Sequence, residues 1–224
     1  MLENIEGVLF DMDGTVLDSE ALFDDAQLLF LKDMGIHASI QDLKEFKGMS
    51  YKHFYPRFTS KFNITLEVNI IRSKIRTYLH EIMETRLKFI KGFEHFFNSY
   101  IKPYNFKVGL VTNTTRLSYQ KIQKCINIDD YFQYVITVNE AKEPKPSPMP
   151  YFQAFNDLSL SNKKTLIIED SKTGLTSAIK SGAHVVGLTT SLNKKQIQKI
   201  NKNIIVAQSY VEVGNFLKKI INCK

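Results

Sequence analysis

Short apolar runs that alternate with amphipathic stretches are the feature that most constrains the fold of this 224-residue chain. The runs are rich in Val, Ile and Leu, and such continuous hydrophobicity is typical of strands buried on both faces of a parallel sheet. Strands that alternate with helices indicate βαβ units and a doubly wound α/β sheet. We expect strands at Ile5–Phe10, Lys107–Thr112, Tyr134–Val138, Thr165–Ile168 and His184–Leu188, with a weaker one at Ile204–Val206. We expect helices at Thr115–Ile126, Pro150–Leu158, Gly174–Ser181 and Val211–Ile221.

One break in this alternation predicts a second domain. Roughly eighty residues after the first strand contain no convincing strand, and their periodicity predicts helices at Ser19–Met34, around Ile40–Lys61 and at Leu66–Lys88. A helical insert between the first two strands is better explained as a small domain than as a crossover. We therefore predict a three-layer α/β/α, Rossmann-like core with a mostly parallel sheet in residues 1–15 and 92–224, and an inserted helical domain in residues 16–91.

The charge of the chain is basic overall but acidic at its N-terminal end. The formal net charge is +7, and the basic residues are 25 Lys and 5 Arg. Residues 1–50 hold eleven acids and three bases, a balance of −8, which leaves +15 for the rest of the chain. Arg is the residue suited to bidentate contacts with phosphate and guanine, and the sequence has no basic helix interleaved with aromatics. We therefore expect no nucleic-acid partner.

Cysteine usage and the lengths of the apolar runs indicate a cytoplasmic protein. Cys125 and Cys223 lack CxxC spacing and a nearby His cluster, which disfavours a disulfide framework and a structural zinc site. The N-terminal segment MLENIEGVLF has no basic region, so we expect no signal peptide. No apolar run reaches the ~18 residues that a transmembrane helix needs, so we expect no membrane partner.

Polar side chains follow four of the predicted strands. Open parallel sheets bind ligands outside the carboxyl ends of their strands, so we expect these residues to meet at one edge. The segment Glu143–Pro150 carries four prolines, which excludes a central strand or the middle of a helix and predicts a loop. The residues that follow the strands are Asp11, Asp13, Thr112, Asn113, Lys145, Glu169 and Asp170.

This set of residues is suited to metal-assisted phosphoryl chemistry. Asp11 and Asp13 point to the same side of an extended segment, so one carboxylate can attack an electrophile while the other transfers a proton. Asp11 and Asp170 can share a Mg²⁺ ion, which binds through one or two carboxylates plus phosphate oxygens and water. Gly14 permits a sharp turn and a close approach to phosphate. The groups expected to hold the outer phosphate oxygens are Thr112, Asn113 and Lys145.

Each motif also has a purely structural explanation. The Asp-x-Asp-Gly-Thr pattern at Asp11–Thr15 occurs in turns and calcium loops, although the residues after it do not fit the EF-hand register. Thr112 and the Glu169–Asp170 pair are suited to capping helices, and Lys145 alone would be a solvated lysine. Their joint occurrence, in order and at strand ends, favours the phosphoryl site.

Four segments around these residues resemble the haloacid dehalogenase-like hydrolase superfamily, specifically the phosphatases related to β-phosphoglucomutase and phosphoglycolate phosphatase. The resemblance spans almost the whole chain, and the helical insert corresponds to the cap domain that this family carries between its first two motifs. The segments are VLFDMDGTVLDSE (Val8–Glu20), GLVTNTT (Gly109–Thr115), KPSPMPY (Lys145–Tyr151) and TLIIEDSKTGLTSAIKSG (Thr165–Gly182).

The resemblance implies a role for each residue. Asp11 would be the nucleophile that forms an aspartyl-phosphate, and Asp13 would be the general acid for the leaving group and then the base that activates water. The side chains of Asp11 and Asp170 and the backbone carbonyl of Asp13 would ligate Mg²⁺, with Glu169 acting through water or through its neighbours. The groups that would bind the phosphoryl group are Thr112 and Lys145, helped by Asn113.

Two positions depart from the β-phosphoglucomutase pattern. Phe23 stands where those enzymes carry a His, and Tyr51 follows the stretch Lys47–Ser50 where they carry an Arg. The missing groups would position a hexose and bind a second phosphate, so their loss favours hydrolysis over mutase chemistry. Lys47 and Gly48 remain candidates for substrate contact from the cap.

Residues and resemblance together predict a Mg²⁺-dependent phosphatase that hydrolyses a small phosphorylated metabolite, such as a sugar phosphate or phosphoglycolate. Its partner would be that phosphate ester, and we expect a monomer or a weak homodimer. Two alternatives stay open. One is a sugar phosphomutase of the β-phosphoglucomutase type, and the more remote one is a non-enzymatic binding module.

Overall fold

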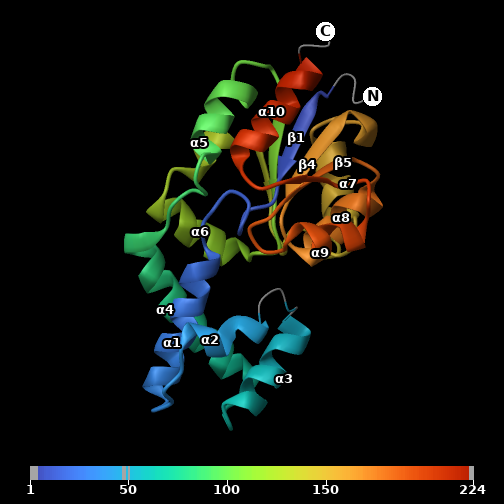
Figure 1. Cartoon of the computed structure of the whole chain (residues 1–224). Helices are drawn as coiled ribbons and strands as arrows, with labels where there is room; N and C mark the ends of the chain where they lie inside the picture. The colour runs from blue at the N-terminus through green and yellow to red at the C-terminus, as the bar shows by residue number, and fades with distance from the viewer. Residues whose placement is uncertain (1–4, 47–48, 50, 222–224) are drawn as a thin grey trace. The chain divides into compact units, whose positions relative to one another are not determined.

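Two compact units make up the chain in the computed structural model, which describes residues 5–46, 49 and 51–221 (Figure 1). The core unit combines Met1–Leu17 with Phe89–Lys224, and the helical unit is Asp18–Lys88. Leu17 and Phe89 form an antiparallel bridge, and the Ile90 N–H donates to the Val16 carbonyl at 2.8 Å. The outgoing and returning chain segments are therefore paired where the helical unit begins and ends.

The core unit is built on a six-stranded sheet with the order β3-β2-β1-β4-β5-β6. Every neighbouring pair is parallel, and β1 lies at the centre between β2 and β4. This confirms the predicted α/β fold with a parallel sheet. The strands are β1 (Gly7–Phe10), β2 (Lys107–Val111), β3 (Tyr134–Ile136), β4 (Thr165–Glu169), β5 (His184–Leu188) and β6 (Ile205–Ala207).

Helices cover both faces of this sheet because the side chains of β1 are apolar on both sides. Leu9 packs in a buried cluster with residues of α7, α8 and α9, whereas Phe10 contacts Phe93 and Phe132 in an aromatic cluster on the opposite face. Figure 1 shows α5 and α10 on that second side. The helices are α5 (Phe93–Phe96), α6 (Arg116–Cys125), α7 (Met149–Asp157), α8 (Lys172–Ser181), α9 (Lys194–Ile200) and α10 (Tyr210–Ile221), with a π-helical turn η2 (Phe97–Ile101) and 3₁₀ turns η3 (Ile128–Tyr131) and η4 (Asn162–Lys164).

The helical unit has an aromatic core of its own. Phe46, Phe54 and Phe58 lie with their ring centroids 5.1 to 5.5 Å apart and are buried among aliphatic residues of the longer helices. Phe23 packs against the same cluster, with its ring centroid 5.9 Å from that of Phe54. The elements are α1 (Glu20–Asp33), α2 (Ile40–Leu43), η1 (Lys44–Phe46), α3 (Tyr51–Lys61) and α4 (Val68–Arg86).

Three local differences from the sequence predictions have physical reasons. β3 ends at Ile136 because the backbone N–H and hydroxyl of Thr137 both donate to Glu140, at 2.9 and 2.6 Å. The helix expected at Pro150–Leu158 is α7 (Met149–Asp157), which begins one residue earlier. Pro150 therefore lies in its first turn, where a missing N–H costs no hydrogen bond. The helix α9 was not predicted, since Ile197 is its single fully buried side chain.

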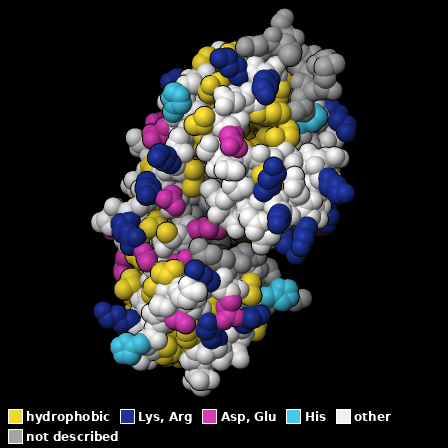
Figure 2. Space-filling model, in the orientation of Figure 1, with side chains coloured by type: hydrophobic (Ala, Val, Ile, Leu, Met, Phe, Trp, Pro, Cys, Tyr) yellow, Lys and Arg dark blue, Asp and Glu magenta, His cyan; other side chains and the backbone are white. Residues whose placement is uncertain are grey.

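Among the lysines and arginines whose burial the structure describes, one is buried and the others lie at the surface. Figure 2 shows Lys and Arg side chains over the visible face of both units. Lys145 is 5% exposed, and every other lysine whose burial the structure describes is exposed. Lys145 therefore differs in burial from every other lysine in the described part of the chain. Within the described ranges, no helix combines the length and hydropathy needed to cross a bilayer.

Candidate active site

The turn after β1 places two carboxylates at the carboxyl end of the sheet. The Asp11 N–H donates to the Ile168 carbonyl of β4 at 3.0 Å, which extends the parallel ladder by one residue. Asp11 is buried and Asp13 is half-buried. Gly14 then turns the chain with φ +76°, and a Cβ at this position would lie 2.1 Å from an oxygen of Asp170. Only glycine fits both the backbone angle and the close approach.

The Lys145 ammonium contacts residues at the carboxyl ends of β1, β2 and β4. Its Nζ donates to Asp11 Oδ1 at 2.6 Å, to the Val111 carbonyl at 2.7 Å and to Glu169 Oε1 at 2.7 Å. The ring of Tyr151 lies beneath it, with 5.2 Å between Nζ and the centroid. A buried ammonium with three acceptors is fully satisfied, so its position is fixed by the protein.

Asn113 fixes the backbone of the same lysine. The Asn113 side-chain amide donates to the Lys145 carbonyl at 3.0 Å, and its oxygen accepts from the Lys145 N–H at 3.0 Å. Both ends of the amide are thus engaged with the loop that carries Lys145. Thr112, which precedes Asn113 in the sequence, is buried, and its hydroxyl oxygen accepts from the Thr114 N–H at 3.0 Å.

Glu169 is completely buried and organises the turn after β4. Its Oε2 accepts from the Asp170 N–H at 2.9 Å, and from the Ser171 N–H at 3.1 Å and hydroxyl at 3.2 Å. Its Oε1 accepts from Lys145 and, at 3.4 Å, from the Tyr151 hydroxyl. Both carboxylate oxygens have protein partners, so this side chain holds its neighbours in place.

We expect Gly174→Ala to displace Glu169 and destabilise the core unit. A Cβ at Gly174 would lie 1.5 Å from Glu169 Oε1 and within 2.3 Å of the rest of the carboxyl group. The buried carboxylate cannot withdraw without losing its donors, so unfolding free energy should fall by about 2 kcal/mol. Urea denaturation measures this loss, with Lys180→Ala on the exposed side of α8 as the matched control. Equal midpoints for the two variants would contradict the prediction.

Hydroxyl groups that the sequence analysis missed surround Asp170. Thr15 Oγ1 donates to Asp170 Oδ1 at 3.2 Å, and Thr190 Oγ1 lies 3.2 Å from Oδ2. Ser191 Oγ also donates to Oδ2. Thr190 and Ser191 follow β5, so the signal that identified the other strand ends was present for this one too.

Two further polar contacts hold the loop after β1. Thr114 Oγ1 donates to Asp13 Oδ2 at 2.7 Å. The buried Tyr210 hydroxyl donates to the Thr15 carbonyl at 2.9 Å, and burial raises the pKa of this tyrosine well above its ordinary value. The loop is therefore supported from the segment that follows β2 and from α10.

Among the described side chains of the site, carboxylates outnumber ammonium groups. Asp11, Glu169 and Asp170 offer carboxylate oxygens that all lie within 4.8 Å of one another, and Lys145 is the cation that pairs with two of them. Burial and the Glu169 carboxylate raise the pKa of Asp11 well above its ordinary value, although the Lys145 ammonium acts in the opposite direction. Burial disfavours the Lys145 ammonium, yet Asp11 and Glu169 hold its pKa well above its usual range. Hard oxygen ligands with excess negative charge fit a divalent cation such as Mg²⁺.

The structure brings together most of the residues selected from the sequence. Asp11, Lys145 and Glu169 are in direct contact, and Asn113 contacts the backbone of Lys145. The cap candidates Lys47 and Gly48 lie outside the described residues. The selected residues with a described position at this edge are Asp11, Asp13, Thr112, Asn113, Lys145, Glu169 and Asp170.

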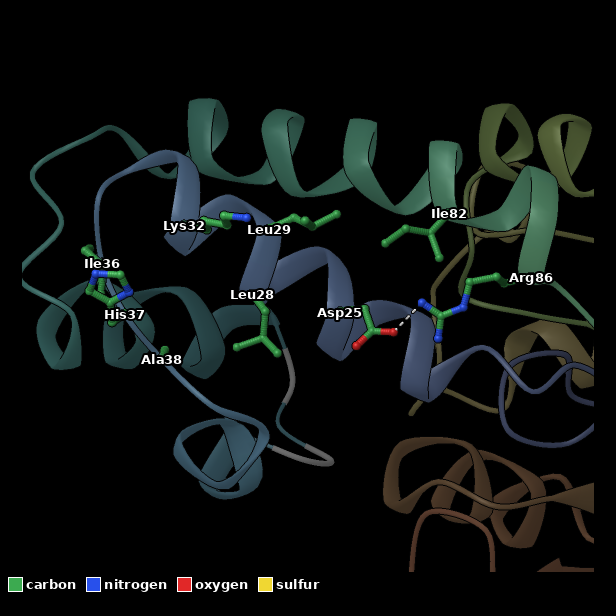
Figure 3. Close-up of a pocket in the computed structure, with 9 residues that line it drawn as sticks. All are labelled: Asp25, Leu28, Leu29, Lys32, Ile36, His37, Ala38, Ile82 and Arg86. Carbon is green, nitrogen blue, oxygen red and sulfur yellow. Dashed lines mark ion pairs between the residues drawn. The ribbon is translucent and has the colours of Figure 1, made fainter.

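A separate pocket of about 360 Å³ lies within the helical unit (Figure 3). It is formed by α1, the segment after α1 and α4, and an Asp25–Arg86 ion pair of 2.7 Å lies on its wall. None of the selected residues that the structure describes lines this pocket. The lining residues are Asp25, Leu28, Leu29, Lys32, Ile36, His37, Ala38, Ile82 and Arg86.

Comparisons with known proteins agree on one family. The sequence profile of the haloacid dehalogenase-like hydrolases matches residues 8–188. The chain is 22% identical to the phosphorylated carbohydrates phosphatase of Thermotoga maritima, covering 97% of this chain and 100% of that protein. It is 24% identical to the phosphoglycolate phosphatase of Photorhabdus laumondii, covering 86% and 84%. A crystal structure of a haloacid dehalogenase-like protein from Agrobacterium tumefaciens shares the fold, with a TM-score of 0.80 at 18% identity over 97% of this chain and 100% of the other.

Proposed function

Because this chain belongs to the haloacid dehalogenase-like hydrolase family, we propose that it is a Mg²⁺-dependent phosphatase of small phosphorylated metabolites. The observation that carries the proposal is the burial of Lys145 beside Asp11. Lys145 is the one buried lysine among those described, and its Nζ lies 2.6 Å from Asp11 Oδ1. A fixed cation beside a carboxylate at the end of a parallel sheet suits the transfer of an anionic phosphoryl group.

We assign the nucleophile to Asp11 and the acid and base roles to Asp13. An Asp11 oxygen attacks phosphorus, the bond from phosphorus to the ester oxygen breaks, and that oxygen takes a proton from the Asp13 carboxyl. Water then attacks the phosphorus of the aspartyl-phosphate while Asp13 takes a proton from it, which releases inorganic phosphate and restores the Asp11 carboxylate. We assign Lys145 to offsetting the charge on the transferred group, and Thr112, which is buried at the end of β2, to binding the same group.

The residues that would hold Mg²⁺ are Asp11, Asp170 and the backbone carbonyl of Asp13. When bound, Mg²⁺ would neutralise charge on the phosphoryl oxygens. We assign Glu169 a supporting role, because its Oε1 accepts from the Lys145 ammonium and its Oε2 accepts from the backbone N–H groups of Asp170 and Ser171. Thr15, Thr190 and Ser191 orient the Asp170 carboxylate, as supporting hydroxyls do for metal ligands elsewhere.

The substrate class follows from the relatives by analogy. The named relatives act on phosphorylated carbohydrates and on phosphoglycolate, and we propose a phosphomonoester of that size for this chain. The helical unit, which we propose as an inserted cap domain, is where specificity would lie. Phe23 packs in the aromatic core of this unit, in the place of the His expected of a β-phosphoglucomutase.

A panel of phosphomonoesters assayed with and without metal tests the proposed function. The panel contains phosphoglycolate, glycerol phosphate, glucose 6-phosphate, 6-phosphogluconate, β-glucose 1-phosphate and para-nitrophenyl phosphate. We expect release of inorganic phosphate with Mg²⁺ and a loss of about a hundredfold after chelation, because neutralising the transferring group is worth several kcal/mol. Adding Mg²⁺ back should restore the rate.

Different outcomes of this assay separate the alternatives. Formation of glucose 6-phosphate from β-glucose 1-phosphate, faster than phosphate release, would establish a mutase instead. No phosphate release from any ester, combined with salt-sensitive binding to random DNA, would favour a binding module. An unchanged rate after chelation would contradict the metal requirement while leaving the phosphatase assignment in place.

A further inference from the structure

We propose that Thr114 is a positioning residue for Asp13, and that its hydroxyl holds one carboxylate oxygen so that the other delivers the proton to the leaving group. The inference deepens the proposed function and rests on it, because it takes Asp13 as the general acid. Thr114 was not among the residues selected from the sequence. What singles it out is the 2.7 Å hydrogen bond from its Oγ1 to Asp13 Oδ2.

The donor in this hydrogen bond is held on both sides by backbone contacts. The Thr114 N–H donates to Thr112 Oγ1 at 3.0 Å, and the Thr114 carbonyl accepts from the Val138 N–H at 3.1 Å. Thr112 follows β2 directly, and Val138 follows β3. The hydroxyl of Thr114 is therefore attached to the ends of two neighbouring strands, and aiming it at Asp13 costs little further conformational entropy.

The acceptor is held just as firmly. Gly14 follows Asp13 in a left-handed conformation, its N–H donates to the Leu17 carbonyl at 2.8 Å, and its carbonyl accepts from the Thr190 hydroxyl at 2.6 Å. On the other side of Asp13, the Met12 carbonyl accepts from the Val16 N–H at 2.8 Å. With the backbone held on both sides, the Thr114 hydroxyl acts on the rotation of the Asp13 side chain. An acid in a fixed rotamer is pre-organised for proton transfer.

The chemistry makes this role measurable. When the bond from phosphorus to the ester oxygen breaks, its electron pair stays on that oxygen. An alkoxide is a poor leaving group and needs the proton of Asp13 as the bond breaks, whereas a nitrophenolate is stable without it. Displacing Asp13 should therefore slow the cleavage of alkyl phosphates and leave para-nitrophenyl phosphate nearly unaffected.

The test compares Thr114→Val with Thr114→Ser and the wild type. Valine has the shape of threonine without the hydroxyl, and serine restores it. The measured quantity is kcat/KM for para-nitrophenyl phosphate and for the alkyl phosphate of the panel that the wild type cleaves fastest, because kcat/KM reports the steps up to leaving-group departure. We expect Thr114→Val to lose tenfold or more on the alkyl ester and less than about twofold on the aryl ester, with Thr114→Ser close to wild type on both.

The outcomes distinguish this inference from the function beneath it. A wild type that releases phosphate from none of the alkyl esters would overturn the proposed function itself. An active wild type whose Thr114→Val variant loses equal factors on both esters, or loses nothing on the alkyl ester, would overturn the role of Thr114. Unfolding midpoints of the two variants show whether a loss reflects misfolding, and a split between the two esters in folded protein supports the proposal.

Discussion

Replacing Asp11 by asparagine should abolish phosphate release while the protein stays folded. The amide has nearly the shape of the carboxyl group but cannot attack phosphorus, so we expect kcat/KM to fall at least about a thousandfold. Burial and the Glu169 carboxylate destabilise the charged form of Asp11, whereas the Lys145 ammonium stabilises it. Removing the charge eliminates both effects, which partly cancel, so we expect the variant to stay folded. Phosphate release from the best ester of the panel measures the first effect, and urea denaturation measures the second.

The matched control for Asp11→Asn is Asp130→Asn, which makes the same chemical change at an exposed position of the core unit. It should retain wild-type turnover. If Asp11→Asn stayed folded and kept more than a small fraction of the wild-type rate, Asp11 would not be the nucleophile.

Replacing Lys145 by methionine should damage both activity and stability. Methionine fills a similar volume but removes the cation, so Asp11 and Glu169 are left buried without their partner at 2.6 and 2.7 Å. Breaking one side of a buried ion pair costs about 3 kcal/mol of unfolding free energy, and losing a charged contact to the transferring group should lower kcat/KM about a thousandfold. Stability and turnover are measured on the same preparation.

A double variant separates these two effects of Lys145. Combining Lys145→Met with Glu169→Gln removes one of the stranded negative charges, so part of the lost stability should return while activity stays low. Lys142→Met, an exposed change in the same loop, should leave both properties unchanged. Wild-type stability of the Lys145→Met single variant would contradict the ion-pair account, and wild-type activity would contradict the role in phosphoryl binding.

The sheet was predictable because burial on both faces of a parallel strand gives a continuous apolar run. β5 matches its expected range, and β2 and β4 differ by one residue from theirs. The helix α9 was missed because a short helix with one fully buried side chain has no detectable apolar periodicity, although Asn193 and Gln196 form a capping box at its start. Local hydrogen bonding, as at Thr137, also moves a strand end without leaving a hydrophobic signal.

The candidate site was predictable to the extent that its residues follow strands in recognisable motifs. Asp11, Lys145 and Glu169 come from segments far apart in sequence, and the parallel topology brings them into contact. Thr114 and Thr190 also follow predicted strands, but threonine is common there as a helix cap, so the pattern alone did not single them out. Only the positions of their partners show what they do.

The measurement that tests the central claim most directly is chemical trapping of the aspartyl-phosphate. Borohydride reduces an acyl phosphate to an alcohol and leaves a free carboxylate intact, so the protein is mixed with its best ester and Mg²⁺, treated with borohydride, digested and analysed by mass spectrometry. We predict conversion of Asp11 to homoserine in the wild type during turnover, and none in Asp11→Asn or without ester. Rapid phosphate release with every Asp11 unmodified, or conversion of a different aspartate, would contradict the account.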